Sequence, residues 1–152
     1  MRGFKSFRND RSTKGGGILF YVNECISSSV VRQSRCNKTE YLFIELKFNR
    51  QKVLFCCIYN SHASNDLYLF LNELNTVSPL YSNIVLTGDF NLDLLNPSKL
   101  SFISSALSSS ALEIISEPTR YPSAINGTSS LLDYFAVSDL MKVSTNWMFK
   151  SI

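Results

Sequence analysis

The sequence lacks long apolar runs and has little charge. No apolar stretch among its 152 residues approaches the roughly 18 that a membrane-spanning helix needs, which excludes a helical membrane protein. The first residues, MRGFKSFRNDRS, lack the apolar core of a secretory signal, so we expect a nuclear or cytoplasmic protein that is not secreted. Charged residues make up only 18% of the chain and hydrophobic residues 45%, a composition that excludes long intrinsic disorder.

Cysteine and histidine are too sparse and too irregularly spaced for a zinc site. The four cysteines show no CxxC spacing, and the chain has a single histidine, His62. The net charge of +3, from 15 Lys and Arg against 12 Asp and Glu, permits nucleic-acid binding without arguing for it. Several of the positive charges fall within residues 1–14, where we expect a basic, flexible arm.

Hydrophobic patterning predicts one α/β domain with more strands than helices. Residues 40–48 alternate with period two and residues 52–59 form a continuous apolar run, so the two are expected to form a hairpin. Residues 66–77 carry an apolar stripe at helical spacing, and a second, serine-rich helix is expected from about Ser98. Further strands are expected over 18–22, 83–87, 112–115, 131–137 and 142–149.

The segment IVLTGDFN, residues 84–91, places a carboxylate and an amide after a buried strand. Asp89 would lie at the rim of the sheet, where open α/β sheets carry their sites, and Asn91 would point the same way if the backbone is extended. Such a pair can orient a water and hold a phosphate oxygen, but it also suits an ordinary Asx turn. Asp133 interrupts an apolar strand, which predicts either a paired carboxylate or a charge on an edge strand.

Five segments in order resemble the endonuclease/exonuclease/phosphatase superfamily, and most closely the endonuclease domain of non-LTR retrotransposons of the LINE and jockey types. They are FRNDRSTKGGGILFYV, EYLFIELKF, VLFCCIYNSHAS, NIVLTGDFNLDLL and EPTRYP…SSLLDYFAVSD. The resemblance covers nearly the whole chain, and the order of GDFN, PTR and LDY is its most specific part. It implies an α/β, deoxyribonuclease-I-like β-sandwich flanked by helices, present as one partial domain over residues 1–152.

The resemblance also implies a reaction, Mg²⁺-dependent hydrolysis of a DNA phosphodiester that primes reverse transcription. Asp89 would orient or activate the attacking water, Asn91 would bind the scissile phosphate, and Tyr59 would contact it. Asp133 would orient a catalytic histidine. Further contacts near the DNA backbone would come from Thr119, Arg120 and Ser130. DNA is thus the implied partner, with no membrane and no small-molecule cofactor.

The chain departs from the family pattern at both ends. The family's metal-binding glutamate precedes the segment with which this sequence begins, so no metal ligand is assigned here. The family's final Ser-Asp-His also has no counterpart, because Ser138-Asp139-Leu140 adjoins the LDY strand directly and His62 follows Tyr59. We therefore expect a fragment, without the first strands and the last, that is catalytically inactive.

Two other functions stay open at this point, and one structural consequence is expected. The alternatives are a non-catalytic module that binds DNA phosphates and a β-rich interaction domain. If flanking strands are lacking, the apolar strands 52–59 and 131–137 are expected to present unpaired edges or an uncovered face.

Overall fold

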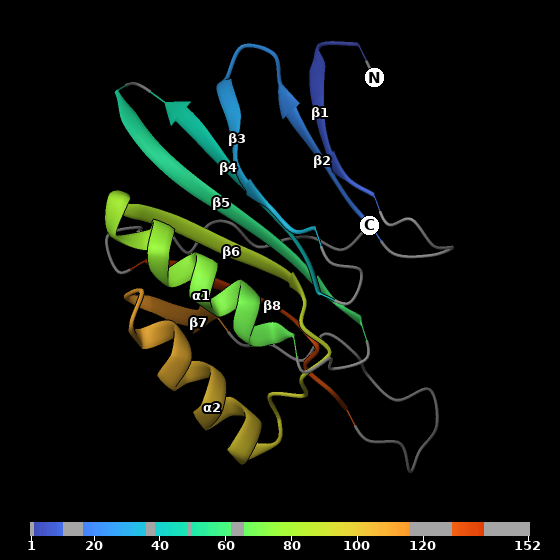
Figure 1. Ribbon diagram of the computed structural model, residues 1–152, viewed down its shortest axis with the longest axis vertical. Coiled ribbons are helices and arrows are strands. Elements are labelled where there is room, and N and C mark those ends of the chain that lie inside the picture. The colour runs from blue at the N-terminus through green and yellow to red at the C-terminus, as the bar shows by residue number, and fades with distance from the viewer. Residues whose placement is uncertain are drawn as a thin grey trace.

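The computed structural model describes residues 2–10, 17–35, 39–48, 50–61, 66–115 and 129–138, with the backbone alone described at 115. These residues form two β-sheets and two α-helices (Figure 1). The strands are β1 (Phe4–Asn9), β2 (Ile18–Asn23), β3 (Ser27–Gln33), β4 (Thr39–Phe48), β5 (Gln51–Asn60), β6 (Asn83–Asp89), β7 (Leu112–Ile115) and β8 (Asp133–Ser138). The helices are α1 (Leu67–Val77) and α2 (Pro97–Ser108), and a short 3₁₀ turn, η2 (Ser78–Leu80), follows α1.

The larger sheet has the strand order β3-β4-β5-β6-β8-β7, and β1 pairs with β2 in a separate sheet. The predicted hairpin of 40–48 and 52–59 is confirmed, because β4 and β5 pair antiparallel with Phe48 opposite Gln51. Strands β5 and β6 pair in parallel, which requires a crossover, and α1 supplies it. This crossover sets the C-terminal ends of β5 and β6 beside each other at one rim of the sheet.

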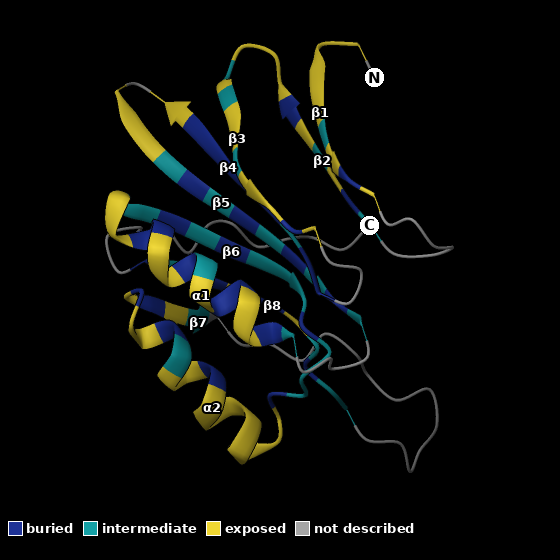
Figure 2. Ribbon diagram, viewed as in Figure 1, coloured by how far each residue is buried: buried dark blue, intermediate teal, exposed yellow. Residues whose placement is uncertain are grey.

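Both helices pack on one face of the larger sheet (Figures 1 and 2). The predicted apolar stripe of α1 is buried there, at Leu67, Phe70, Leu71 and Leu74. Ile103 and Leu107 of α2 are also buried, whereas Leu100, expected on the same side of that helix, is exposed. Because each fully buried Leu or Phe contributes roughly 1.5–3 kcal/mol, this layer stabilises the strands that end at the rim.

Among the described residues, the small sheet covers one part of the opposite face of the larger sheet. Ile18 and Val22 of β2 pack against Leu42, Ile44 and Leu46 of β4, so the small sheet covers that region. On β8 the side chain of Phe135 is 38% exposed. Strands β5 and β8 are interior strands, so the expectation of unpaired edges at 52–59 and 131–137 is wrong. Strand β4 lies beside β5, and β7 lies beside β8. In the described part of the chain the edge strands of this sheet are therefore β3 and β7.

Two strands were not predicted from the sequence. Phe4–Asn9 forms β1, where the basic composition predicts a flexible arm, because Phe7 pairs across to Phe20 and the buried Asn9 amide donates to the Ser34 Oγ. Strand β3 is mostly exposed and serine-rich, so it lacks the apolar pattern that predicts a strand. It forms because its backbone pairs with that of β4. The predicted strand 142–149 lies outside the described residues. No helix in the described ranges is both long and apolar enough to cross a bilayer.

Candidate functional site

Three neighbouring strands bring Tyr59, Asp89 and Asp133 side by side. Tyr59 is opposite Asp89 in the parallel pair β5–β6, and Asp89 is opposite Asp133 in the antiparallel pair β6–β8. Residues directly opposite one another project from the same face of a sheet and lie roughly 5 Å apart. The three residues therefore form a row at one rim, and their side chains leave the sheet on the face away from the helices.

Asn91 lies beside this row but not in extended backbone. Strand β6 ends at Asp89, and Asn91 has a left-handed backbone with φ of +50°. The sequence predicted that Asn91 points the same way as Asp89 if the backbone is extended, and that condition is not met. Asp89 Oδ1 instead accepts the Asn91 N–H at 2.9 Å and closes an Asx turn. The Asn91 Nδ2 donates to the main-chain oxygen of Asn60 at 2.7 Å. The Asx turn and the rim carboxylate thus coexist in one segment.

Asn60 is a polar residue of this rim that sequence reasoning missed. Its side chain is fully buried at the end of β5, where Nδ2 donates to the carbonyl of Phe90 at 2.9 Å and Oδ1 accepts from the Thr39 hydroxyl at 2.9 Å. The signal was available, because Asn60 is in phase with the buried positions Cys56 and Ile58. An amide in a buried series needs hydrogen-bond partners, and this one finds them in Phe90, directly after Asp89, and in Thr39 of β4.

Asp93 ties the segment before Asp133 to the same turn. Its Oδ1 accepts the N–H of Leu131 at 3.0 Å and that of Leu95 at 3.1 Å. Backbone hydrogen bonds from Phe90 to Leu132 and from Leu94 to Leu131, each 3.0 Å, continue the contact beyond the strands. This places the half-buried Ser130 next to the turn. The sequence offered only a weak signal for Asp93, an acidic residue four positions after Asp89.

Glu40 extends the row on the other side of Tyr59. It is opposite Tyr59 in the β4–β5 pair, is 2% exposed and accepts a hydrogen bond from the Gly17 N–H. Sequence reasoning missed it, although a carboxylate in phase with the buried face of residues 40–48 was a signal. The row across the sheet is therefore Glu40, Tyr59, Asp89 and Asp133.

Two predicted phosphate contacts, Thr119 and Arg120, lie outside the described residues, as does His62. The described residues hold no group of three or more His, Cys, Asp or Glu side chains placed to bind a metal ion. Mg²⁺ is commonly bound through one or two carboxylates together with waters and substrate phosphates. The described side chains do not make a metal centre by themselves.

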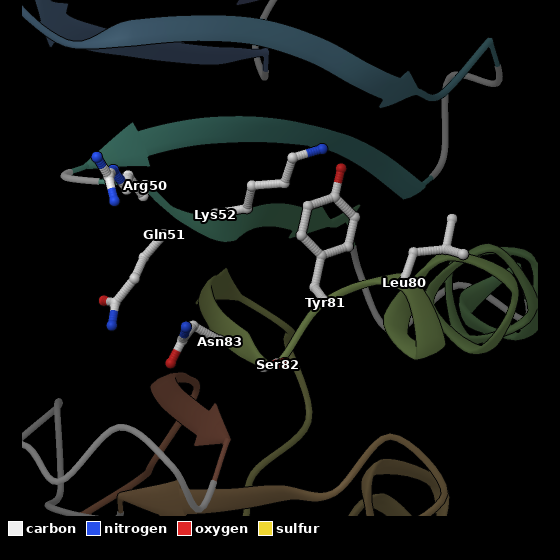
Figure 3. Close-up of a pocket in the computed structure, with 7 residues that line it drawn as sticks. All are labelled: Arg50, Gln51, Lys52, Leu80, Tyr81, Ser82 and Asn83. Carbon is white, nitrogen blue, oxygen red and sulfur yellow. The ribbon is translucent and has the colours of Figure 1, made fainter.

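One open pocket among the described residues lies at the opposite end of the sheet from this row. It has a volume of about 400 Å³ and is lined by residues where β5 and β6 begin, Arg50 to Lys52 and Leu80 to Asn83 (Figure 3). The tips of Lys52 and Tyr81 meet there because both bond to the buried Glu45, the Tyr81 hydroxyl at 2.9 Å and the Lys52 ammonium at 3.2 Å. These contacts join β4 and β5 to the segment that precedes β6, so we assign them a structural role.

The contacts of the Glu45 carboxylate shift its pKa. The hydrogen bond from Tyr81, with those from Lys52 and Lys47, lowers the pKa of Glu45 below its ordinary value of 4.5, against the opposing effect of burial. Burial, with the bond to Glu45, raises the pKa of Tyr81 to about 12. Glu45 is therefore a charged buried group near neutral pH.

The chain resembles known proteins in its structure. The sequence matches no family model, and no curated protein sequence matches it. The endonuclease domain of TRAS1, a telomere-specific non-LTR retrotransposon, superposes with a TM-score of 0.69 at 13% identity, over 93% of this chain and 69% of that one. An endonuclease/exonuclease/phosphatase family protein from Bacteroides thetaiotaomicron gives 0.59 at 14% identity, over 90% and 62%.

A third structure, D. rerio TDP2 complexed with a single-strand DNA product, gives a TM-score of 0.58 at 11% identity, over 90% of this chain and 62% of that one. The chain thus spans about three fifths of the last two proteins. The likenesses agree with the α/β architecture and with the mixed sheet described above. They show that this chain shares the fold of these proteins, which is deoxyribonuclease-I-like.

Proposed function

We propose that this chain is an endonuclease-like domain of the non-LTR retrotransposon type that binds DNA through its phosphodiester backbone. The observation that carries the proposal is the row of Tyr59, Asp89 and Asp133 at one rim, with Asn91 held beside it. A site for a phosphodiester needs hydrogen-bond donors for phosphate oxygens next to a group that can orient a water. The hydroxyl, the amide and the carboxylates of this rim supply both.

The side-chain amide of Asn91 can bind a phosphate oxygen because its NH₂ group has a second N–H donor. An amide NH₂ has two N–H groups, and one of them donates to the Asn60 carbonyl. The other can donate to a phosphate oxygen, and the Tyr59 hydroxyl can donate to a second. Asp89 would orient the water, and Asp133 would orient a histidine if one were supplied. Thr119, Arg120 and Ser130 are proposed as further backbone contacts.

We also propose that these 152 residues bind DNA without hydrolysing it at an appreciable rate. Their single histidine is His62, which does not match the histidine expected to pair with Asp133. Loss of a general acid or base typically lowers a rate by roughly 10²- to 10⁴-fold. Mg²⁺ would reach this rim together with the phosphate oxygens of the substrate, because the described carboxylates do not complete a site.

DNA, rather than another phosphoester, is favoured by the likeness to the TRAS1 endonuclease domain and by the sequence resemblance of the GDFN, PTR and LDY segments. The TDP2 structure, solved with a DNA product, is consistent with DNA use on this fold. A phosphatase on a small substrate is the second candidate, since phosphatases share the fold. Small-molecule sites are usually enclosed pockets, and that is the feature that would distinguish this candidate from a DNA-binding rim.

Binding of fluorescently labelled duplex DNA, measured by anisotropy with Mg²⁺ over a range of salt concentrations, tests this proposal. Phosphate contacts predict that the logarithm of the affinity falls linearly with the logarithm of the salt concentration. Asn91→Asp replaces the donor with a charge, and we expect an affinity at least tenfold lower. The matched control is Asn72→Asp, the same change at an exposed position of α1. Equal affinities of the two variants, or no binding by the wild type, would refute the proposal.

A further inference from the structure

The peptide group that joins Phe90 to Asn91 is held by side chains on both of its polar atoms. Its carbonyl oxygen accepts from Asn60 Nδ2 at 2.9 Å. Its N–H donates to Asp89 Oδ1 at 2.9 Å. A peptide group held in this way cannot rotate without breaking one of these bonds. The orientation of Asn91 is therefore set from two strands, β5 and β6.

Asn60 is itself fixed in one orientation. The Phe90 carbonyl can only accept, so the Asn60 amide must turn its nitrogen toward it, and its oxygen then faces Thr39. The Thr39 hydroxyl donates to that oxygen at 2.9 Å, across the β4–β5 pair. Both residues are buried, with Asn60 0% and Thr39 1% exposed. Water therefore does not compete for these bonds, and the amide stays in place.

The conformation of Asn91 needs this support. Its φ of +50° lies in the left-handed region, which costs a non-glycine residue roughly 1 kcal/mol. Such residues persist where their surroundings determine them, and they concentrate at functional sites. Asn60 acts on Asn91 twice, through the Phe90 carbonyl and by accepting the Asn91 Nδ2 with its own main-chain oxygen at 2.7 Å.

We propose that Asn60 is a positioning residue that orients the Asn91 amide toward a DNA phosphate. The inference rests on the proposed function for the role of Asn91, but the positioning is a property of this chain alone. Asn60 does not touch the DNA. It acts through the peptide group before Asn91, and Thr39 keeps its amide in the required orientation.

Two variants of the 152-residue chain test the inference, so that the test still stands if one substitution prevents folding. Asn60→Asp keeps the shape but turns an oxygen toward the Phe90 carbonyl. Thr39→Val is isosteric and removes the hydroxyl that donates to Asn60, a milder change of about 1 kcal/mol in stability. Thr39→Ser, which keeps a hydroxyl, is the conservative comparison, and Asn72→Asp controls for the added charge. Thermal unfolding shows which variants are folded.

The measurements are the hydrogen exchange of the Asn91 backbone N–H, followed by NMR, and the affinity for labelled duplex DNA with Mg²⁺. In the folded variants Asn60→Asp and Thr39→Val we expect faster exchange at Asn91 and affinity lower by about tenfold. Thr39→Ser should retain most of the affinity. A merely structural role would speed exchange throughout the sheet, whereas positioning confines the change to residues 90 and 91.

Each outcome decides between the inference and its failure. Unchanged exchange at Asn91 in Thr39→Val would overturn it. Faster exchange with unchanged DNA affinity would also overturn it, since Asn91 would then not need its orientation for phosphate. If the wild type does not bind DNA at all, the proposed function fails, and with it the phosphate role, while the exchange data still show whether Asn60 holds the Asn91 peptide.

Discussion

Gly88 lies directly opposite Ile58 in the parallel pair β5–β6, and a Cβ on Gly88 would come within 1.9 Å of the Ile58 carbonyl oxygen. The φ of Gly88 is +139°, a conformation that residues with side chains rarely adopt. Glycine is therefore required immediately before Asp89. The close approach of the two backbones is also what sets Tyr59 next to Asp89 one residue further along.

Gly88→Ala should lower the free energy of unfolding by about 3 kcal/mol, because the added methyl meets backbone that cannot give way. Gly3→Ala is the matched control, since Gly3 also has a positive φ, of +79°, but nothing within 4 Å of an added Cβ. We expect about 1 kcal/mol there, the cost of the conformation alone. Urea denaturation of both variants measures the difference, and equal losses would show that β5 and β6 are not so close.

Tyr134→Phe should leave the protein at least as stable as the wild type. The Tyr134 hydroxyl is buried without a hydrogen-bond partner in the described ranges, and burial raises the pKa of this group. Removing an unsatisfied buried hydroxyl relieves a desolvation penalty, and the ring keeps its stacking on Phe90, with centroids 4.0 Å apart. Tyr81→Phe is the contrast, because it loses the bond to Glu45 and about 1 kcal/mol. A large loss in Tyr134→Phe, seen by thermal unfolding, would contradict this.

The stability of the protein should depend on the charge of Glu45 in acid. Tyr81, Lys52 and Lys47 lower the pKa of Glu45 in the folded state below 4.5, so the unfolded chain takes up this proton first as the pH falls. The charged side chain therefore stabilises the fold fully above about pH 4.5, and the contribution disappears as the pH falls through the folded-state pKa. We expect Glu45→Gln to be less stable than the wild type at pH 7, with a difference that shrinks below pH 4.5.

Urea denaturation over a pH series measures the difference in stability between Glu45→Gln and the wild type. Glu24→Gln, at an exposed position after β2, is the control for the general effect of removing one negative charge. A difference between wild type and Glu45→Gln that grows in acid would show that the three contacts do not stabilise the carboxylate.

The purified chain should not nick supercoiled DNA in the presence of Mg²⁺ faster than its Asp89→Ala variant. The reason is that the single histidine, His62, is not the one expected to pair with Asp133, and the described carboxylates do not complete a metal site. Gel electrophoresis of plasmid DNA after long incubation measures the rate. Nicking that needs Mg²⁺ and disappears in Asp89→Ala would show that this chain carries a complete active site.

The elements that the sequence predicted are those with a recognisable apolar pattern, either a period or a continuous run. The alternation of residues 40–48 and the apolar run of 52–59 predicted the hairpin, and the stripe from Leu67 to Leu74 predicted α1. Such predictions are possible because the spacing of apolar residues indicates which positions are buried. Strands β1 and β3 have weak patterns, and they form because the next strand along the chain, β2 and β4 respectively, offers each of them backbone hydrogen bonds.

The candidate site divides in the same way. The sequence by itself determined that Asp89 follows a buried strand and that Asp133 lies in another, since both follow from local pattern. Only the tertiary structure decided that they are neighbours, because the order β5-β6-β8 depends on a crossover helix and on a strand that returns from more than 40 residues away. It also decided the conformation of Asn91, which depends on hydrogen bonds from Asn60, a residue on another strand whose partners no local sequence pattern specifies.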